Sequence, residues 1–351
     1  MAPSNSTSAP RPPAATSPPA ASERAEQDGT ARTARPGPRD RDPVGRRRGR
    51  GRPSPAACDP GAGPPCLEKS YPTSRDQVEH MTKNSTASTA STWTGMVPVD
   101  DTALAVTDTG GPGVPVLYLN GQFATQGYWR RVIAELGTEW RHISYDERAR
   151  GKSKRSADYS FEAAVRDVDA VLAARGVDRA LVVGWSYGAC VAAHWAGRNP
   201  KRAVGAVLVD GAFPYDWLDA AMEERIRKLF RRLGWFLPLL RPTGLAPRMT
   251  AEQQADSNIE LGRLSREREL GPVLDDITVP VRYVVASGTS FGSRGDEQEQ
   301  IRTGLDAVIA RNPNIRIGAK VASNHGAILK REFPAIAEAV REVAALDREA
   351  R

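Results

Sequence analysis

The stretch Ala180-Leu181-Val182-Val183-Gly184-Trp185-Ser186-Tyr187-Gly188 decides the fold of this chain. An apolar run with the length of a buried strand leads into G-x-S-x-G, and small apolar residues over 189–196 favour a packed helix. A strand that turns this sharply into a helix has no space for side chains two positions before and after the serine. The pattern therefore predicts a strained Ser186 with its hydroxyl exposed at the end of a sheet. The alternative, a helix-opening loop that merely contains glycines, does not account for the strand and helix on either side.

Strand-like and helix-like segments alternate on both sides of this turn. This spacing is typical of βαβ units and predicts an α/β fold, with a mostly parallel central sheet and helices on both faces. The predicted strands are 95–99, 102–107, 114–119, 140–145, 180–183, 203–209, 279–285 and 315–321. The predicted helices are 128–136, 160–175, 189–199, 297–311 and 328–346.

Residues 214–276 interrupt the alternation with helix-forming, amphipathic sequence. Because they lie between two predicted sheet strands, we expect a helical cap inserted above the carboxyl edge of the sheet. The basic amphipathic part, 225–233, is also compatible with contact to a membrane surface.

Residues 1–93 are rich in Pro, Ala and Arg and poor in aromatic and β-branched residues. Such a segment buries too little apolar surface to offset the entropy of ordering, so we predict a disordered tail ahead of the folded domain at 94–351. Arg50-Gly51-Arg52-Pro53 resembles the core of an AT-hook, which suggests tail-mediated DNA association, although a solvated basic tail is the simpler interpretation. Met81 is a second plausible start, so residues 1–80 need not belong to the natural protein.

The composition favours a soluble, cytoplasmic protein. The chain has 351 residues and a net charge of +7 from 49 Lys and Arg against 42 Asp and Glu. No apolar run approaches the length needed to span a membrane, and the N-terminus lacks the apolar core of a signal peptide. Cys58, Cys66 and Cys190 make neither a disulfide framework nor a zinc pattern. No metal or organic cofactor is implied, and the expected partner is a small-molecule substrate.

The order of motifs resembles the α/β-hydrolase superfamily over about residues 95–346. A turn at Asn120-Gly121 is followed by residues 146–153, where relatives have a D-x-R-G-x-G-x-S loop. The nucleophile elbow at Ser186 comes next, and a late histidine, His325, completes the order. The resemblance implies the fold of that superfamily and a serine hydrolase activity.

A serine hydroxyl needs a base to take its proton before it becomes a good nucleophile. Of the four histidines, His80 lies in the tail, His142 opens a strand at the wrong end of the sheet, and His194 lies in the helix after the turn. His325 alone follows a strand in a loop near the expected site. We therefore predict Ser186 as the nucleophile and His325 as the base.

The resemblance also implies an oxyanion hole made of two backbone N–H groups, those of Gln122 and Tyr187. This chain has Asn120 where relatives commonly have histidine, a change that a backbone donor should survive.

The acid of the catalytic triad is ambiguous. Relatives carry it soon after the strand at 279–285, where this chain has Thr289, which is not an acid. Asp210, which ends the strand at 203–209, is the first candidate, and Asp296 further along the loop is the second. The third possibility, that no acid is present, stays open.

These features together predict a carboxylesterase-like enzyme that cleaves an ester, thioester or lactone of a small to medium apolar compound. Trp185 and Trp129 are predicted to contact the substrate, although aromatic side chains fit a protein core equally well. Further candidate walls of the site are Trp217, Phe230 and Trp235. Epoxide or haloalkane opening is less favoured, since those reactions need a carboxylate at the elbow. The alternative is a weak or inactive binding protein with the same fold, and the sequence does not indicate an oligomeric state.

Overall fold

The chain divides into two units, residues 1–80 and 81–351. The computed structural model describes residues 91–236, 239, 247–288 and 295–350, with only the backbone described for 295–300 and 302. The predictions for the tail, namely its disorder, the AT-hook resemblance and the place of His80, lie outside the described residues.

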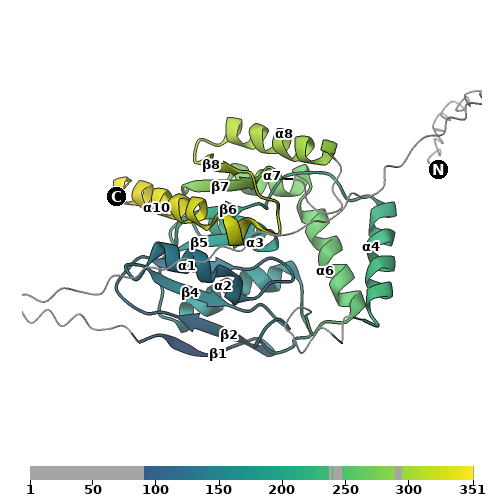
Figure 1. Ribbon diagram of the computed structural model, residues 1–351, viewed down its shortest axis with the longest axis horizontal. Coiled ribbons are helices and arrows are strands. Elements are labelled where there is room, and N and C mark those ends of the chain that lie inside the picture. The colour runs from purple at the N-terminus through teal and green to yellow at the C-terminus, as the bar shows by residue number, and fades with distance from the viewer. Residues whose placement is uncertain (1–90, 237–238, 240–246, 289–294, 351) are drawn as a thin grey trace, which may run out of the picture. The chain divides into compact units, whose positions relative to one another are not determined.

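A single sheet of eight strands organises the described part of the second unit, in the order β1-β2-β4-β3-β5-β6-β7-β8 (Figure 1). β2 pairs antiparallel with β1 and β4, and the other neighbours pair in parallel. The mostly parallel sheet predicted from the alternation is therefore confirmed. The strands are β1 Trp93–Val99, β2 Thr102–Asp108, β3 Pro115–Leu119, β4 Arg141–Tyr145, β5 Ala180–Trp185, β6 Ala203–Val209, β7 Val281–Ala286 and β8 Ile315–Val321.

Helices cover both faces of this sheet, as predicted. One face packs against a short 3-10 helix, η1 (Gln126–Trp129), and against α1 (Arg130–Leu136), α9 (Ile328–Arg331) and α10 (Phe333–Glu349). The other face packs against α2 (Phe161–Ala174), α3 (Tyr187–Arg198), α7 (Glu267–Asp275) and α8 (Gly295–Arg311). The single closing helix predicted at 328–346 is two helices, because Pro334 stands in the first turn of α10 and has no N–H to continue α9.

The central strand β5 explains why the sheet needs both layers. Its residues are all buried, and Val182 packs on the α3 side while Leu181 and Val183 pack on the α10 side. Successive side chains of a strand point to opposite faces, so a continuous apolar run is stable only when both faces are covered.

Within the described residues between β6 and β7, two helices form the cap. These are α4 (Ala220–Leu233) and α6 (Ala251–Leu264), which pack against each other at one end of the sheet (Figure 1). α6 begins with a capping box in which Thr250 and Gln253 satisfy each other's backbone N–H groups. α7 packs against α3 and α8, so it belongs to the helix layer of the sheet. The cap therefore ends before α7, and the boundary expected near residue 276 is wrong.

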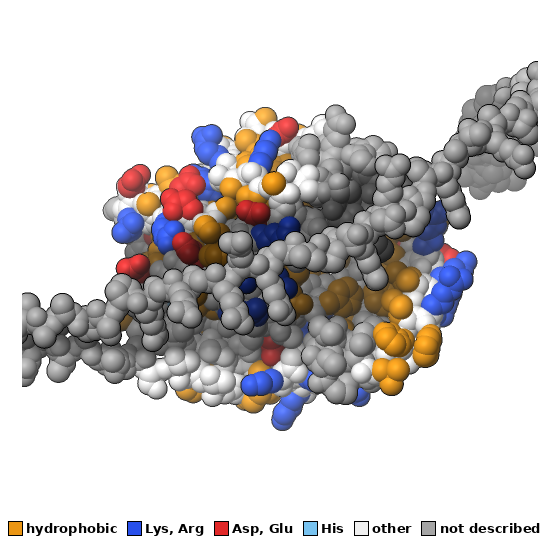
Figure 2. Space-filling model, in the orientation of Figure 1, with side chains coloured by type: hydrophobic (Ala, Val, Ile, Leu, Met, Phe, Trp, Pro, Cys, Tyr) orange, Lys and Arg blue, Asp and Glu red, His pale blue; other side chains and the backbone are white. Residues whose placement is uncertain are grey.

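The helix α4 is amphipathic. Phe230 is its buried residue and stacks on Phe123, with ring centroids 6.2 Å apart, whereas Leu229 and Leu233 are exposed. Figure 2 shows basic side chains along the edge of the molecule where α4 lies in Figure 1. Trp235, expected as an apolar wall, is 76% exposed and lines none of the cavities described below.

A buried arginine ties the β1–β2 turn to α2. The Arg148 guanidinium donates to both carboxylate oxygens of Asp167, at 2.9 and 2.7 Å, and to Asp100 at 2.7 Å. Arg148 and Asp167 are both buried, whereas Asp100 is about half exposed. Removing one partner of a buried pair leaves the other charge uncompensated, which costs far more than a surface pair is worth.

We therefore expect Arg148→Met to lower the free energy of unfolding in urea by about 3 kcal/mol. The matched control is Arg166→Met, since Arg166 pairs with Asp100 and Asp158 from an exposed position. The control should change stability by less than about 1 kcal/mol. Equal effects of the two substitutions would contradict this assignment.

Candidate active site

Ser186 sits at a sharp turn between β5 and α3, with φ at +56°, a backbone conformation that L residues rarely adopt. Its N–H donates to Val209 of the neighbouring strand at 3.0 Å, which fixes the strained residue to the sheet. A Cβ on Gly184 would lie 2.1 Å from the Gly188 carbonyl oxygen, and one on Gly188 would lie 2.2 Å from the Leu119 oxygen. Only glycine fits at positions 184 and 188, as the G-x-S-x-G pattern predicts.

His325 and Asp210 meet at this turn although they lie far apart in the sequence. His325, in the loop between β8 and α9, has Nε2 3.1 Å from Ser186 Oγ and Nδ1 2.7 Å from Asp210 Oδ2. Asp210 directly follows β6, and its other oxygen accepts the N–H of Ala286 at 3.0 Å, which orients the carboxylate. The three side chains thus form one hydrogen-bonded series, with the nucleophile at one end and the acid at the other.

The remaining acid candidate does not enter this series through any described contact. Asp296 lies in α8, where the structure describes its backbone but not its side chain, and Thr289 lies outside the described residues.

The other two described histidines are structural. His142 is buried between the Tyr118 hydroxyl and the Gly137 carbonyl, at 2.8 Å from each. His194 is buried in α3, and burial lowers its pKa to about 4, so it is neutral at physiological pH. Both positions agree with the exclusion of these two histidines as the base, which left His325 as the predicted one.

The two backbone N–H groups predicted as oxyanion donors belong to the loop after β3 and to the first residue of α3. Within the described residues, the N–H groups of Gln122 and Tyr187 donate to no protein oxygen. The Gln122 side chain donates to Ser257 Oγ in α6 at 3.1 Å, so the loop after β3 is connected to the cap. Unpaired N–H groups beside a nucleophile are what an oxyanion hole requires.

No sequence pattern indicates what holds the loop after β3 in place. Glu147, in the loop after β4, accepts the Asn120 N–H at 2.9 Å and the Asn120 side-chain amide at 3.0 Å. The amide also donates to the Tyr145 carbonyl, and its oxygen accepts the Trp129 indole N–H at 2.9 Å. Asn120 is thereby fully satisfied in the position where relatives have histidine. Glu147 stands inside the motif at 146–153, but no sequence pattern distinguishes a buried carboxylate from a solvated one there.

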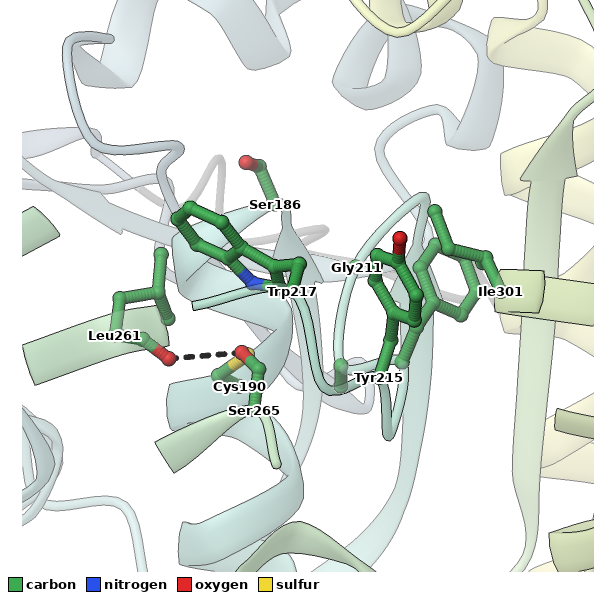
Figure 3. A pocket seen from close by; sticks show the side chains of 10 residues that line it. Ser186, Cys190, Gly211, Tyr215, Trp217, Leu261, Ser265 and Ile301 are labelled. Atoms are coloured by element: carbon green, nitrogen blue, oxygen red, sulfur yellow. Dashed lines mark hydrogen bonds between the residues drawn. The ribbon is translucent and has the colours of Figure 1, made fainter. Parts of the chain in front are cut away.

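A cavity of about 300 Å³ opens beside Ser186 (Figure 3). Its walls come from α3, the loop after β6, α6 and α8, and are mostly apolar. In Figure 3 the Trp217 ring lies on the Leu261 side of the cavity, and Tyr215 and Ile301 lie on the other. The remaining lining residues are Cys190, Gly211, Ala212, Phe213 and Ser265. The cavity therefore suits an apolar group attached at Ser186.

The two tryptophans predicted to contact substrate differ in position. Trp185 packs against His325 with ring centroids 5.4 Å apart and is 9% exposed, so it borders the site without lining this cavity. Trp129 is fully buried, packs on Tyr118 and donates to Asn120. Its expected role as a substrate wall is wrong, because the ring faces the layer between the sheet and α1.

Within the part of the chain that the structure describes, no group of three or more His, Cys, Asp and Glu side chains could hold a metal ion. No helix in that same part is both long and apolar enough to cross a membrane.

Burial raises the pKa of Glu147 to about 7, so the folded protein holds this proton more tightly than the unfolded chain does. A raised carboxyl pKa makes the folded state lose stability as pH rises from about 4.5 to about 7, by up to about 3 kcal/mol. Glu147→Gln removes this loss, so the stability of the variant relative to wild type should rise across that window in urea titrations. The exposed Glu135→Gln serves as control, and a relative stability of Glu147→Gln independent of pH would contradict the assignment.

Gly188→Ala should disrupt the Ser186 turn, because the added carbon would overlap the backbone at Leu119. We expect a loss of at least about 3 kcal/mol in the free energy of unfolding. Gly176→Ala is the comparison, since Gly176 has a positive φ but nothing lies within 4 Å of the added carbon, whereas Gly188 has no positive φ and a crowded site. A cost for Gly188→Ala no larger than that for Gly176→Ala would contradict the role of close approach at the turn.

Comparisons with known proteins agree with this geometry. Residues 114–245 match the family model described as alpha/beta hydrolase fold. The chain is 30% identical over 139 residues to a haloalkane dehalogenase of Mesorhizobium japonicum, which covers 39% of this chain and 45% of that protein. It is 32% identical over 103 residues to a putative carbamate hydrolase of Klebsiella pneumoniae, covering 28% and 39%. The matches thus span less than half the length of these curated relatives.

Solved structures share the fold at low sequence identity. An esterase from Thermogutta terrifontis superposes with a TM-score of 0.56 at 20% identity, covering 73% of this chain and 100% of that one. A putative lipase from Acinetobacter baumannii gives a TM-score of 0.59 at 17% identity, covering 74% and 93%. The sheet order, the turn at Ser186 and the match of residues 114–245 together show that the described part of the second unit has the α/β-hydrolase fold.

Proposed function

We propose that this protein is a serine hydrolase that cleaves carboxyl esters through an acyl-enzyme on Ser186. The observation that supports the proposal most directly is the hydrogen-bonded series from Ser186 Oγ through His325 to Asp210. Thioesters and lactones react by the same acyl transfer and fall within the proposal. No residue of this machinery requires a metal or an organic cofactor.

The proposed mechanism uses the same groups in both half-reactions, with His325 acting first as base and then as acid. His325 Nε2 takes the proton of Ser186 as Oγ attacks the ester carbonyl carbon. Asp210 holds Nδ1, which keeps Nε2 available to the serine and stabilises the imidazolium that forms. The N–H groups of Gln122 and Tyr187 donate hydrogen bonds to the carbonyl oxygen and stabilise the negative charge that develops on it. His325 then returns the proton to the leaving alcohol, and water releases the acid by the reverse sequence.

The identity of the nucleophile favours acyl transfer over the reaction named for one relative. A carboxylate at the elbow can form an alkyl ester with a haloalkane, whereas a serine hydroxyl is suited to attack on a carbonyl carbon. The apolar cavity of about 300 Å³ beside Ser186 supports a small to medium acyl group.

The test is turnover of p-nitrophenyl esters with acyl chains of graded length. We expect activity to peak at short to medium chains and to disappear in Ser186→Ala. If no ester is turned over, the alternative of a binding protein with the hydrolase fold is favoured instead.

The acid is tested by comparing two isosteric substitutions. Asp210→Asn should reduce kcat by about 10⁴-fold, the loss expected when the histidine loses its orienting carboxylate. Asp296→Asn should leave kcat near the wild-type value. The reverse pattern would assign the acid to Asp296.

A further inference from the structure

A second, smaller cavity lies behind the two residues that carry the proposed oxyanion donors. The Tyr187 side chain lines it, and so does Ser257, the hydrogen-bond partner of the Gln122 side chain. Arg150, from the loop after β4, also lines it and is only 7% exposed. This cavity has no part in the mechanism above.

Arg150 is a buried cation with no hydrogen-bonded carboxylate among the described residues. Among the described residues its guanidinium has no hydrogen-bond acceptor and no carboxylate in ion-pair contact, and Nε is completely shielded from solvent. The face of the Tyr187 ring, whose centroid is 5.9 Å from the guanidinium carbon, is its main described neighbour. A buried charge is costly unless it is paired and hydrogen-bonded, so the arrangement is incomplete without an anion.

The nearby carboxylates do not fill that role. Asp167 is held by Arg148 through two hydrogen bonds. Both oxygens of Glu147 accept from Asn120, and burial outweighs the attraction of Arg150 so that the Glu147 pKa is about 7. At neutral pH Glu147 therefore supplies only part of a counter-charge to Arg150.

Hydroxyl groups line the same cavity as the guanidinium. Tyr159 accepts from the Ser156 N–H and Ser257 accepts from Gln122, so each hydroxyl still has its own proton to donate. The Tyr187 hydroxyl makes no hydrogen bond to any described residue. An unpaired guanidinium surrounded by hydroxyl donors is suited to an anionic group.

The dimensions limit what the ligand can be. The space at Arg150 is about 20 Å³, and the cavity shares Tyr159, Ser160 and Ser257 with a second cavity of about 440 Å³ beside α6. The two cavities are therefore neighbours, and the space at Arg150 has room only for a small charged group. A planar carboxylate matches the flat fork of a guanidinium and carries a single charge, so Glu147, Asp167 and Glu260 repel it less than they repel a doubly charged tetrahedral phosphate.

We infer that Arg150 and the hydroxyls of Tyr159, Tyr187 and Ser257 form a binding site for the carboxylate group of a ligand. The carboxylate belongs either to the ester substrate or to a separate ligand. The first source rests on the proposed function, and the second does not.

Binding is tested on the full chain with glutarate, its neutral analogue glutaramide and inorganic phosphate, by calorimetry at constant ionic strength. We expect glutarate to bind to the wild type. Its affinity should fall at least about tenfold in Arg150→Met, the loss expected for a charge-assisted hydrogen bond. The control is Arg155→Met, an exposed arginine nearby with no described partner, which should leave the affinity unchanged. Equal binding of glutarate and glutaramide, tighter binding of phosphate, or unchanged binding in Arg150→Met would overturn the inference.

Two further measurements distinguish a loss of binding in Arg150→Met from a folding defect. The ligand-free melting temperature of Arg150→Met should equal or exceed that of wild type, because the substitution removes an unpaired buried charge. Arg150→Lys keeps the charge but loses the fork, so it should bind glutarate with intermediate affinity.

The source of the carboxylate is decided by kinetics. The p-nitrophenyl monoester of glutaric acid is compared with p-nitrophenyl pentanoate, which has the same chain length and no charge. If the carboxylate is the substrate's own, Arg150→Met should lower kcat/KM for the charged ester about tenfold more than for the neutral one. If kcat/KM in Arg150→Met falls by the same factor for both esters while glutarate binding is lost, the carboxylate belongs to a ligand other than the substrate. If wild type hydrolyses neither ester, the proposed function fails and the binding result still stands.

Discussion

The close approach of backbone segments around Ser186 is the constraint on which the site depends. Gly184 meets Gly188, and Gly188 meets the end of β3 at Leu119, at distances that exclude a side chain on either glycine. The same contact brings the loop that begins at Asn120 next to the serine. The strained turn therefore sets the positions of the nucleophile and of the proposed oxyanion donors together.

Three charged residues in the loop after β4, Glu147, Arg148 and Arg150, have three different environments. Glu147 is buried and accepts hydrogen bonds from Asn120, so it holds the loop after β3. Arg148 is buried in a complete ion pair with Asp167 that fastens α2 to the β1–β2 turn. Arg150 is buried with no ion pair among the described residues and faces a cavity. The contacts of Glu147 and Arg148 have a structural role in this loop. The burial of Arg150 has no structural explanation, which is why a ligand is inferred there.

The sequence predicted the fold well because alternating apolar runs and G-x-S-x-G are local signals. His325 could be reached by elimination, since each other histidine lay in a strand, a helix or the tail. The acid could not be decided, because it depends on which loop brings a carboxylate to His325 in space, and the 2.7 Å contact with Asp210 joins residues 115 positions apart. Trp129 was misjudged because an aromatic residue after a loop looks the same whether it faces a cavity or, as here, the sheet. The end of the cap was misplaced because α7 has cap-like amphipathic sequence but packs on α3 and α8.

Covalent labelling of the serine tests the central claim most directly. The full chain is treated with a fluorophosphonate, digested, and mapped by mass spectrometry, with Ser186→Ala as control. The account predicts one adduct, on the peptide that contains Ser186, and none in the variant. Absence of an adduct, or an adduct that persists in Ser186→Ala, would contradict it.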